Sequence, residues 1–311
     1  MIFKILLNSI FVSLLVWPAA SEQTGLLATV DSDNHVDYQQ VQHYLPTVAN
    51  KYPLPVKTSQ SLGIVTSSDS AIVIDDASGQ ILWQKNPGQR QALASLVKLM
   101  TAYVFLQQDY DFDQVIEITD TNKTDPEESS LSVVKGEQIT VYDLFLSALV
   151  GSANNATREL VYSLGYSQEQ FVEMMNDTAK DLGMNDTTFT DVTGIDKGNR
   201  STAADYIKLV RLAFNQEIIQ QITVKPDHRF KSVSEQEHYV KNSNDLIGSD
   251  LDIVAGKTGF TYEAGYCLAL KVADEDGNNV IILNLGSSSS AQRFADVKNL
   301  TLWTQHNYRW D

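Results

Sequence analysis

Apolar positions recur with a helical period directly after Ser95. Apolar residues occupy positions i, i+3, i+4, i+7 and i+8 of this segment, namely Leu96, Leu99, Met100, Tyr103 and Val104. Further apolar residues fill much of the remaining helix surface. Because a helix that is apolar nearly all round must be covered on every side, the pattern predicts a buried helix that begins near residue 95.

Two short apolar runs precede this helix. They cover residues 71–74 and 81–83 and flank a segment rich in Asp and Gly at 75–79, which predicts a β-hairpin. The ordered domain is expected to begin at residue 63 and to extend to residue 311. Residues 22–62 are polar and show no sustained period of 2 or 3.6, so we expect a tether or a loosely attached arm there.

The middle third of the chain has helical patterns, and the last third returns to strands. Capping sequences at Thr140, Ser167 and Thr202 open helices that end near residues 150, 183 and 214, within a helical lobe at about 111–224. Strands are predicted at 229–233, 237–241, 253–261, 265–273 and 279–285, before a closing helix at 290–306. This order predicts an α/β (α+β) fold, in which one sheet is built from both termini and a helical lobe is inserted between them.

Composition and charge narrow the class of protein. The chain has 311 residues, of which 43% are hydrophobic and 20% charged, so collagen, coiled coil and wholesale disorder are excluded. The length predicts one large domain or two closely packed ones. The formal net charge of -16 argues against nucleic acid or an anionic membrane surface as a partner, because both bind positively charged protein surfaces.

The N-terminus predicts the compartment. Lys4 is followed by a largely apolar run at 5–17 and by small residues at 19–21, the pattern of a secretory signal peptide covering residues 1–21. An uncleaved anchor is the alternative, but the run is shorter than the ~20 residues of a spanning helix, so we expect no stable membrane anchor after cleavage. Cys267 is the single cysteine, and we expect it to be a buried apolar side chain. An exported protein without any possible internal disulfide is typical of the bacterial envelope. We therefore expect a location in the bacterial envelope, either periplasmic or secreted.

Candidate chemistry begins with Ser95 and Lys98 at the start of the predicted buried helix. Residues three apart share a helical face, so the hydroxyl and the amine can come within hydrogen-bond distance. Burial lowers the pKa of an amine until it can act as a base. The same spacing at Ser132 and Lys135 precedes Gly136 in a turn-like context, which predicts an exposed loop without function.

Two further motifs follow in order. Ser152-Ala-Asn154 lies at a predicted junction between helices, and Lys257-Thr-Gly259 lies on a predicted strand. A second copy of the first of these patterns, Ser32-Asp-Asn34, lies upstream of Ser95 in the predicted tether, which is the wrong order. The ordered set of three motifs is that of penicillin-binding proteins and class A β-lactamases.

With these motifs the sequence resembles the low-molecular-mass penicillin-binding proteins, the serine D-Ala-D-Ala carboxypeptidases and endopeptidases of bacterial cell walls. The resemblance covers roughly residues 63–310 and includes the segments 94–101, 182–184, 201–205 and 264–268. It implies a β-lactamase/transpeptidase-like fold with an antiparallel sheet, peptidoglycan stem peptides as substrates and β-lactam antibiotics as ligands. The chain stops soon after the closing helix, so it looks like the short endopeptidase-type members.

The resemblance also implies a role for each motif residue. Ser95 would be the acylated nucleophile and Lys98 its base, while Ser152 and Asn154 would relay the proton and hold the substrate amide. The terminal carboxylate would be held by Lys257 and Thr258. The backbone N–H groups of Ser95 and Phe260 would form the oxyanion hole, and we expect Gly259 to leave space for the substrate backbone. Val97 departs from the threonine of many relatives at a position outside the chemistry.

Other chemistries have weaker support. The five histidines lack the spacing of metal ligands, so we expect neither a metal nor another cofactor. The Glu-x-x-Leu-Asn segment of class A β-lactamases is missing between Asn154 and Lys257, which favours a peptidase over a β-lactamase-like hydrolase. A catalytically idle peptidoglycan-binding protein is the remaining alternative. Arg293 is expected to be a surface residue of the last helix, with a second cation for the substrate carboxylate as the less favoured interpretation.

Overall fold

The computed structural model describes residues 25–30, 36–41, 54–121 and 128–310. The chain divides into two compact units, residues 1–51 and 52–311. In the first unit, strands β1 (Gly25–Val30) and β2 (Val36–Val41) pair antiparallel, although no strand was predicted there. The predicted signal peptide and the motif at 32–34 lie outside the described residues.

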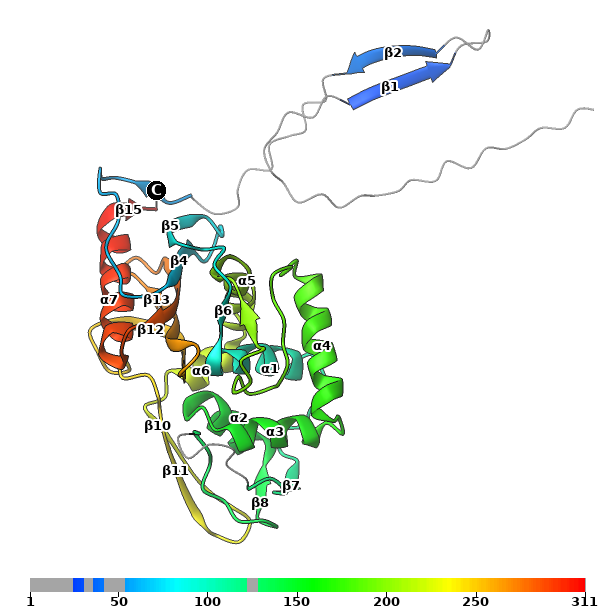
Figure 1. Ribbon diagram of the computed structural model, residues 1–311, viewed down its shortest axis with the longest axis vertical. Coiled ribbons are helices and arrows are strands. Elements are labelled where there is room, and N and C mark those ends of the chain that lie inside the picture. The colour runs from blue at the N-terminus through cyan, green and yellow to red at the C-terminus, as the bar shows by residue number, and fades with distance from the viewer. Residues whose placement is uncertain (1–24, 31–35, 42–53, 122–127, 311) are drawn as a thin grey trace, which may run out of the picture. The chain divides into compact units, whose positions relative to one another are not determined.

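The second unit is organised around one five-stranded antiparallel sheet built from both ends of the unit (Figure 1). Its strands, in spatial order, are β12 (Asp252–Thr261), β13 (Gly265–Ala273), β14 (Asn279–Ser287), β4 (Ser70–Asp75) and β5 (Ile81–Lys85). This arrangement confirms the predicted fold class. In this order β12 is an edge strand, so one of its sides has no partner within the sheet.

Helices cover both faces of the sheet (Figure 1). The last helix, α7 (Ser290–Asn307), packs on β13 and β14, while α5 (Ala203–Ala213) and α6 (Glu217–Thr223) pack on the other side. The side chains of β4 alternate between two apolar cores: Ala71 and Val73 face the α7 core, and Ile72 and Ile74 face the core of the helical lobe. The strand is therefore buried on both faces.

The helical lobe contains the predicted buried helix. A 3₁₀ turn η1 (Ala94–Leu96) leads into α1 (Val97–Phe105), where Tyr103 alone is only partly buried. Helices α2 (Val141–Val150), α3 (Asn154–Ser163) and α4 (Gln168–Asp181) surround it. The predicted caps are present, since the side chains of Thr140, Ser167 and Thr202 accept from backbone N–H groups in the first turns of α2, α4 and α5.

Four short strand pairs complete the second unit. They are β6 (Gln91–Ala92) with β9 (Arg200–Ser201), β7 (Val115–Glu117) with β8 (Gln138–Thr140), β10 (Asp227–Lys231) with β11 (Glu237–Lys241), and β3 (Val56–Lys57) with β15 (Tyr308–Arg309). The β3–β15 pair shows that the larger unit includes residues before 63, so the predicted boundary is too late.

The β10–β11 hairpin is a further correction, because the strands predicted at 229–233 and 237–241 do not join the main sheet. Two histidines explain its position. His228 on β10 contacts the carboxylate of Asp143 at 2.9 Å, and His238 on β11 contacts Glu137 at 2.6 Å. These polar contacts hold the hairpin against the helical lobe. Helix α6 was not predicted. Among the described residues, no helix is long and apolar enough to cross a membrane.

Candidate active site

Ser95 and Lys98 meet at the junction of η1 and α1. The Nζ atom of Lys98 donates to Ser95 Oγ at 3.0 Å. It also donates to the side-chain oxygen of Asn154 and, at 2.7 Å, to the carbonyl of Thr193. Only 1% of Lys98 is exposed, whereas Ser95 is partly exposed and lines a cavity. The predicted pairing of hydroxyl and amine is therefore present in the structure.

The environment of Lys98 suits it to accept a proton. Burial lowers the pKa of its amine from 10.5 to about 7. The negative charges of Asp191 and Glu128 act in the opposite direction and raise this pKa, while the positive charge of Arg158 lowers it. Near neutral pH a substantial fraction of the amine is uncharged and can act as a base.

The second motif lies between helices α2 and α3, as predicted. Asn154 is the first residue of α3, and Ser152 precedes it in a left-handed backbone conformation with φ of 62°. Ala94, directly before Ser95, is also left-handed, with φ of 48°. Residues other than glycine rarely adopt this conformation and need surrounding structure to hold them there. Backbone strain is thus found at Ser152 itself and at the residue directly before Ser95.

Lys257 on β12 faces the second serine. Its Nζ atom donates to Ser152 Oγ at 2.9 Å and to the carbonyl of Thr258 at 2.9 Å. Burial, followed by the positive charges of Lys98 and Arg293, holds the pKa of Lys257 well below its usual value. The site therefore contains two buried lysines, each hydrogen-bonded to one serine.

Thr258 and Phe260 lie on the same strand at the cavity. The hydroxyl of Thr258 contacts that of Ser243 at 2.6 Å, a partner that no sequence motif indicated. Phe260 is 37% exposed and stacks on Tyr266 with ring centroids 4.3 Å apart. The last four residues of β12, 258–261, all line the cavity.

The packing of the chain gives a further reason for a glycine at position 259, besides the predicted one. A Cβ atom at this position would lie 3.2 Å from the Cβ of Ala94, from the carbonyl oxygen of Leu93 and from the backbone nitrogen of Leu96. The missing side chain thus allows β12 to approach the turn that carries Ser95. Gly259 also lines the cavity, and its predicted role of leaving space for the substrate backbone stays a prediction.

The surface interpretation of Arg293 was also wrong. Only 7% of this residue is exposed. Its Nη1 atom donates to the carbonyls of Gly259, at 3.1 Å, and Cys267, at 3.4 Å, and the residue lines the same cavity as Ser95. The start of α7 therefore brings a cation to the C-terminal part of β12.

The cavity that joins these residues has a volume of about 330 Å³. Its lining includes eight residues that were not predicted as site residues, and these are Glu128, Ser129, Gly151, Gly194, Ile195, Ser243, Thr261 and Tyr262. They lie on loops or at the ends of helices and strands, where neither a spacing motif nor a helical or strand period marks them. Only the folded chain brings them together.

The second serine–lysine pair and the single cysteine lie where they were predicted. Ser132 and Lys135 lie in an exposed loop. Cys267 is buried, and burial raises the pKa of its thiol to about 11, which makes it an apolar core residue at neutral pH.

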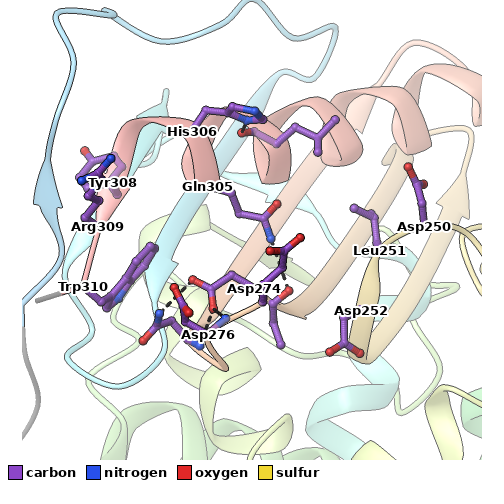
Figure 2. Close-up of a pocket in the computed structure, with 14 residues that line it drawn as sticks. Asp250, Leu251, Asp252, Asp274, Asp276, Gln305, His306, Tyr308, Arg309 and Trp310 are labelled. Atoms are coloured by element: carbon purple, nitrogen blue, oxygen red, sulfur yellow. Dashed lines mark hydrogen bonds between the residues drawn. The ribbon is translucent and has the colours of Figure 1, made fainter.

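A larger cavity of about 880 Å³ lies at the opposite end of β12 (Figure 2). It is bordered by Asp252 at the start of β12, by Asp274 and Asp276 in the turn after β13, and by His306 and Trp310 near the end of the chain. None of the residues of the three motifs lines it. The smaller cavity beside Ser95 is therefore the candidate active site.

Comparisons with known proteins agree with this fold. The family model described as D-alanyl-D-alanine carboxypeptidase matches residues 56–289. The chain is 31% identical over 257 residues to a D-alanyl-D-alanine endopeptidase of Pseudomonas aeruginosa, with 81% of each chain covered, and 30% identical to that of Escherichia coli, with 77% of each covered. Penicillin-binding protein D2 of Listeria monocytogenes, solved with bound cefotaxime, has 29% identity and a TM-score of 0.70, over 79% of this chain and 100% of that one.

Fold, motifs and relatives together define a serine peptidase of the penicillin-binding class. The chain belongs to the D-alanyl-D-alanine carboxypeptidase family, the low-molecular-mass penicillin-binding proteins, as the resemblance implied.

Proposed function

We propose that this chain is a serine DD-peptidase that cleaves D-Ala-D-Ala ends or D-Ala-linked crosslinks of peptidoglycan through an acyl-enzyme on Ser95, and that it acts in the periplasm or outside the cell. The observation that carries the proposal is the 3.0 Å contact between Lys98 Nζ and Ser95 Oγ, with the pKa of Lys98 lowered to about 7. The names of the relatives, endopeptidase and carboxypeptidase, support the substrate class.

In the first step, neutral Lys98 takes the proton of the Ser95 hydroxyl, and Oγ bonds to the carbonyl carbon of the penultimate D-Ala. Charge on the carbonyl oxygen is stabilised by the backbone N–H groups of Ser95 and Phe260. When the amide bond breaks, the leaving amine receives the proton through Ser152, whose hydroxyl is bonded to Lys257. Asn154, which already binds Lys98, orients the substrate amide.

In the second step, water attacks the ester carbonyl carbon. Lys98 accepts the proton of this water and returns it to Ser95 Oγ as the ester C–O bond breaks. The reaction consumes one water and releases the shortened peptide, with no net change in the enzyme. Every proton transfer uses side chains of the chain itself.

Recognition of the substrate follows from the position of β12 at the edge of the sheet. An extended peptide can lie along this free edge and form backbone hydrogen bonds with it. The hydroxyl of Thr258 and the guanidinium of Arg293 line the cavity, and together with the amine of Lys257 they can bind a terminal carboxylate. A β-lactam presents a reactive carbonyl and a carboxylate in the same way, so penicillins are expected to acylate Ser95.

The proposal is tested by digesting purified crosslinked peptidoglycan and a stem pentapeptide with the wild-type enzyme and with Ser95→Ala. We expect wild-type enzyme to release D-Ala from the pentapeptide, to cut crosslinked dimers, or both, and the variant to do neither. Ser132→Ala serves as the matched control, because Ser132 has the same spacing to a lysine in an exposed loop. Binding of peptidoglycan without any turnover by folded wild-type enzyme would favour the idle binding protein instead.

A further inference from the structure

One carboxylate organises a tight turn beside the catalytic pair. The side chain of Asp191 accepts hydrogen bonds from the backbone N–H groups of Thr193 at 2.7 Å, Gly194 at 2.5 Å and Asp196 at 2.6 Å. It also accepts from the hydroxyl of Thr193 at 3.2 Å. Aspartate commonly stabilises turns by accepting hydrogen bonds from backbone groups a few residues ahead. Here a single side chain accepts from three backbone N–H groups, the last of them five positions ahead.

This turn contacts Lys98 directly. The carbonyl of Thr193 accepts from Lys98 Nζ at 2.7 Å, so the position of the amine depends on where the turn holds that oxygen. The neighbouring carbonyl of Val192 accepts from Thr101 Oγ1 at 2.6 Å, which fixes the turn to the next turn of α1.

The same turn contacts the backbone next to Ser95. Gly194 has φ of 93°, and a Cβ atom added to it would lie 1.9 Å from the carbonyl oxygen of Ala94 and 3.0 Å from the backbone nitrogen of Ser95. The turn therefore lies directly against the strained residue that precedes the nucleophile. A displacement of the turn would move both the base and the nucleophile.

We propose that Asp191 is a positioning residue for the Ser95–Lys98 pair, which it holds in reacting geometry through the turn at 191–196. The inference rests on the proposed function, since it assigns Lys98 the role of base. Geometry at this scale matters, because a misplacement of about 1 Å in a reacting group can cost about 10²-fold in rate.

Asp191 also belongs to the set of charges around Lys98. The negative charges of Asp191 and Glu128 raise the pKa of Lys98, whereas the positive charge of Arg158 lowers it. The amine of Lys257 also lies nearby, and its pKa is lowered first by burial and then by the positive charges of Lys98 and Arg293. Loss of the Asp191 charge alone must then lower the pKa of Lys98. A residue that supported the fold without a charge near Lys98 would not have this effect.

The test is the second-order rate of acylation by a fluorescent penicillin, measured for wild type and Asp191→Asn across the pH range that brackets 7. In wild type the rate should rise with a midpoint near 7, as Lys98 loses its proton. In the variant we expect this acidic limb to move to lower pH by about half a unit or more. The rate on the alkaline plateau should fall about tenfold, because asparagine offers only one oxygen to the turn.

Asp196→Asn is the matched control, because Asp196 is an exposed carboxylate of the same turn whose side chain accepts from the N–H of Gly198. This variant should leave both the acidic limb and the alkaline plateau of the acylation rate unchanged. If Asp191→Asn does not fold, Asp191→Ser, which keeps a hydroxyl acceptor, takes its place.

The inference is overturned if the acidic limb stays in place or if the plateau is unchanged in a variant with the wild-type melting temperature. It is also overturned if neither variant folds, because the turn would then serve the fold as a whole. Failure of wild type to acylate at all would reject the proposed function itself. The two failures are therefore distinct.

Discussion

Replacing Lys98 by arginine is expected to lower the rate of Ser95 acylation by about 10²- to 10⁴-fold, the usual contribution of a general base. Lys98 is the group hydrogen-bonded to Ser95 Oγ, and its pKa of about 7 allows it to accept a proton near neutral pH. A guanidinium stays protonated in proteins and cannot accept the serine proton. The measurement is the second-order rate of covalent labelling by a fluorescent penicillin.

The fold of this variant must be checked separately, since Lys98 is buried and donates to Asn154 and Thr193 as well as to Ser95. Arginine keeps the positive charge and the donors, and a melting temperature near that of wild type would show that the site is intact. Lys135→Arg, in the exposed loop, is the matched control and should label normally. Near-normal acylation by folded Lys98→Arg would show that another group is the base, and Lys257 would be the next candidate.

Replacing Gly259 by valine is expected to lower acylation by about 10²-fold for peptide and β-lactam alike. The added Cβ would meet Ala94, Leu93 and Leu96 at 3.2 Å, and the two further methyl groups would force the turn carrying Ser95 away from β12. Overpacking of this kind also costs about 1–3 kcal/mol of stability. A lower melting temperature should therefore accompany the loss of acylation.

The control for this variant is Gly88→Val, since a Cβ at Gly88 would have no neighbour within 4 Å. It should leave acylation and stability close to those of wild type. Normal acylation by Gly259→Val, despite the close contacts, would mean that the distance between β12 and the Ser95 turn does not control the chemistry.

Much of the fold and site could be predicted from local patterns. The buried helix after Ser95 has a period that only a covered helix explains, and the capping residues marked where α2, α4 and α5 begin. The three motifs were informative because of their order. Ser132 and Lys135 have the same spacing as Ser95 and Lys98, and only context separated the two pairs.

Long-range contacts account for what was missed. The strands β10 and β11 have ordinary strand patterns, and their histidines contact Asp143 and Glu137, which lie far away in sequence. Arg293 was predicted to lie on the surface because nothing near it in sequence reveals the carbonyls of Gly259 and Cys267. Such partners are visible only once the chain is folded.

The central claim is that Ser95 forms the acyl-enzyme, and mapping the site of penicillin attachment tests it most directly. Wild-type protein would be labelled with a fluorescent penicillin and digested, and the modified peptide would be sequenced by mass spectrometry. We expect a single labelled peptide with the adduct on Ser95, and no label in Ser95→Ala. An adduct on Ser152 or Ser132, or no adduct on folded wild-type protein, would contradict it.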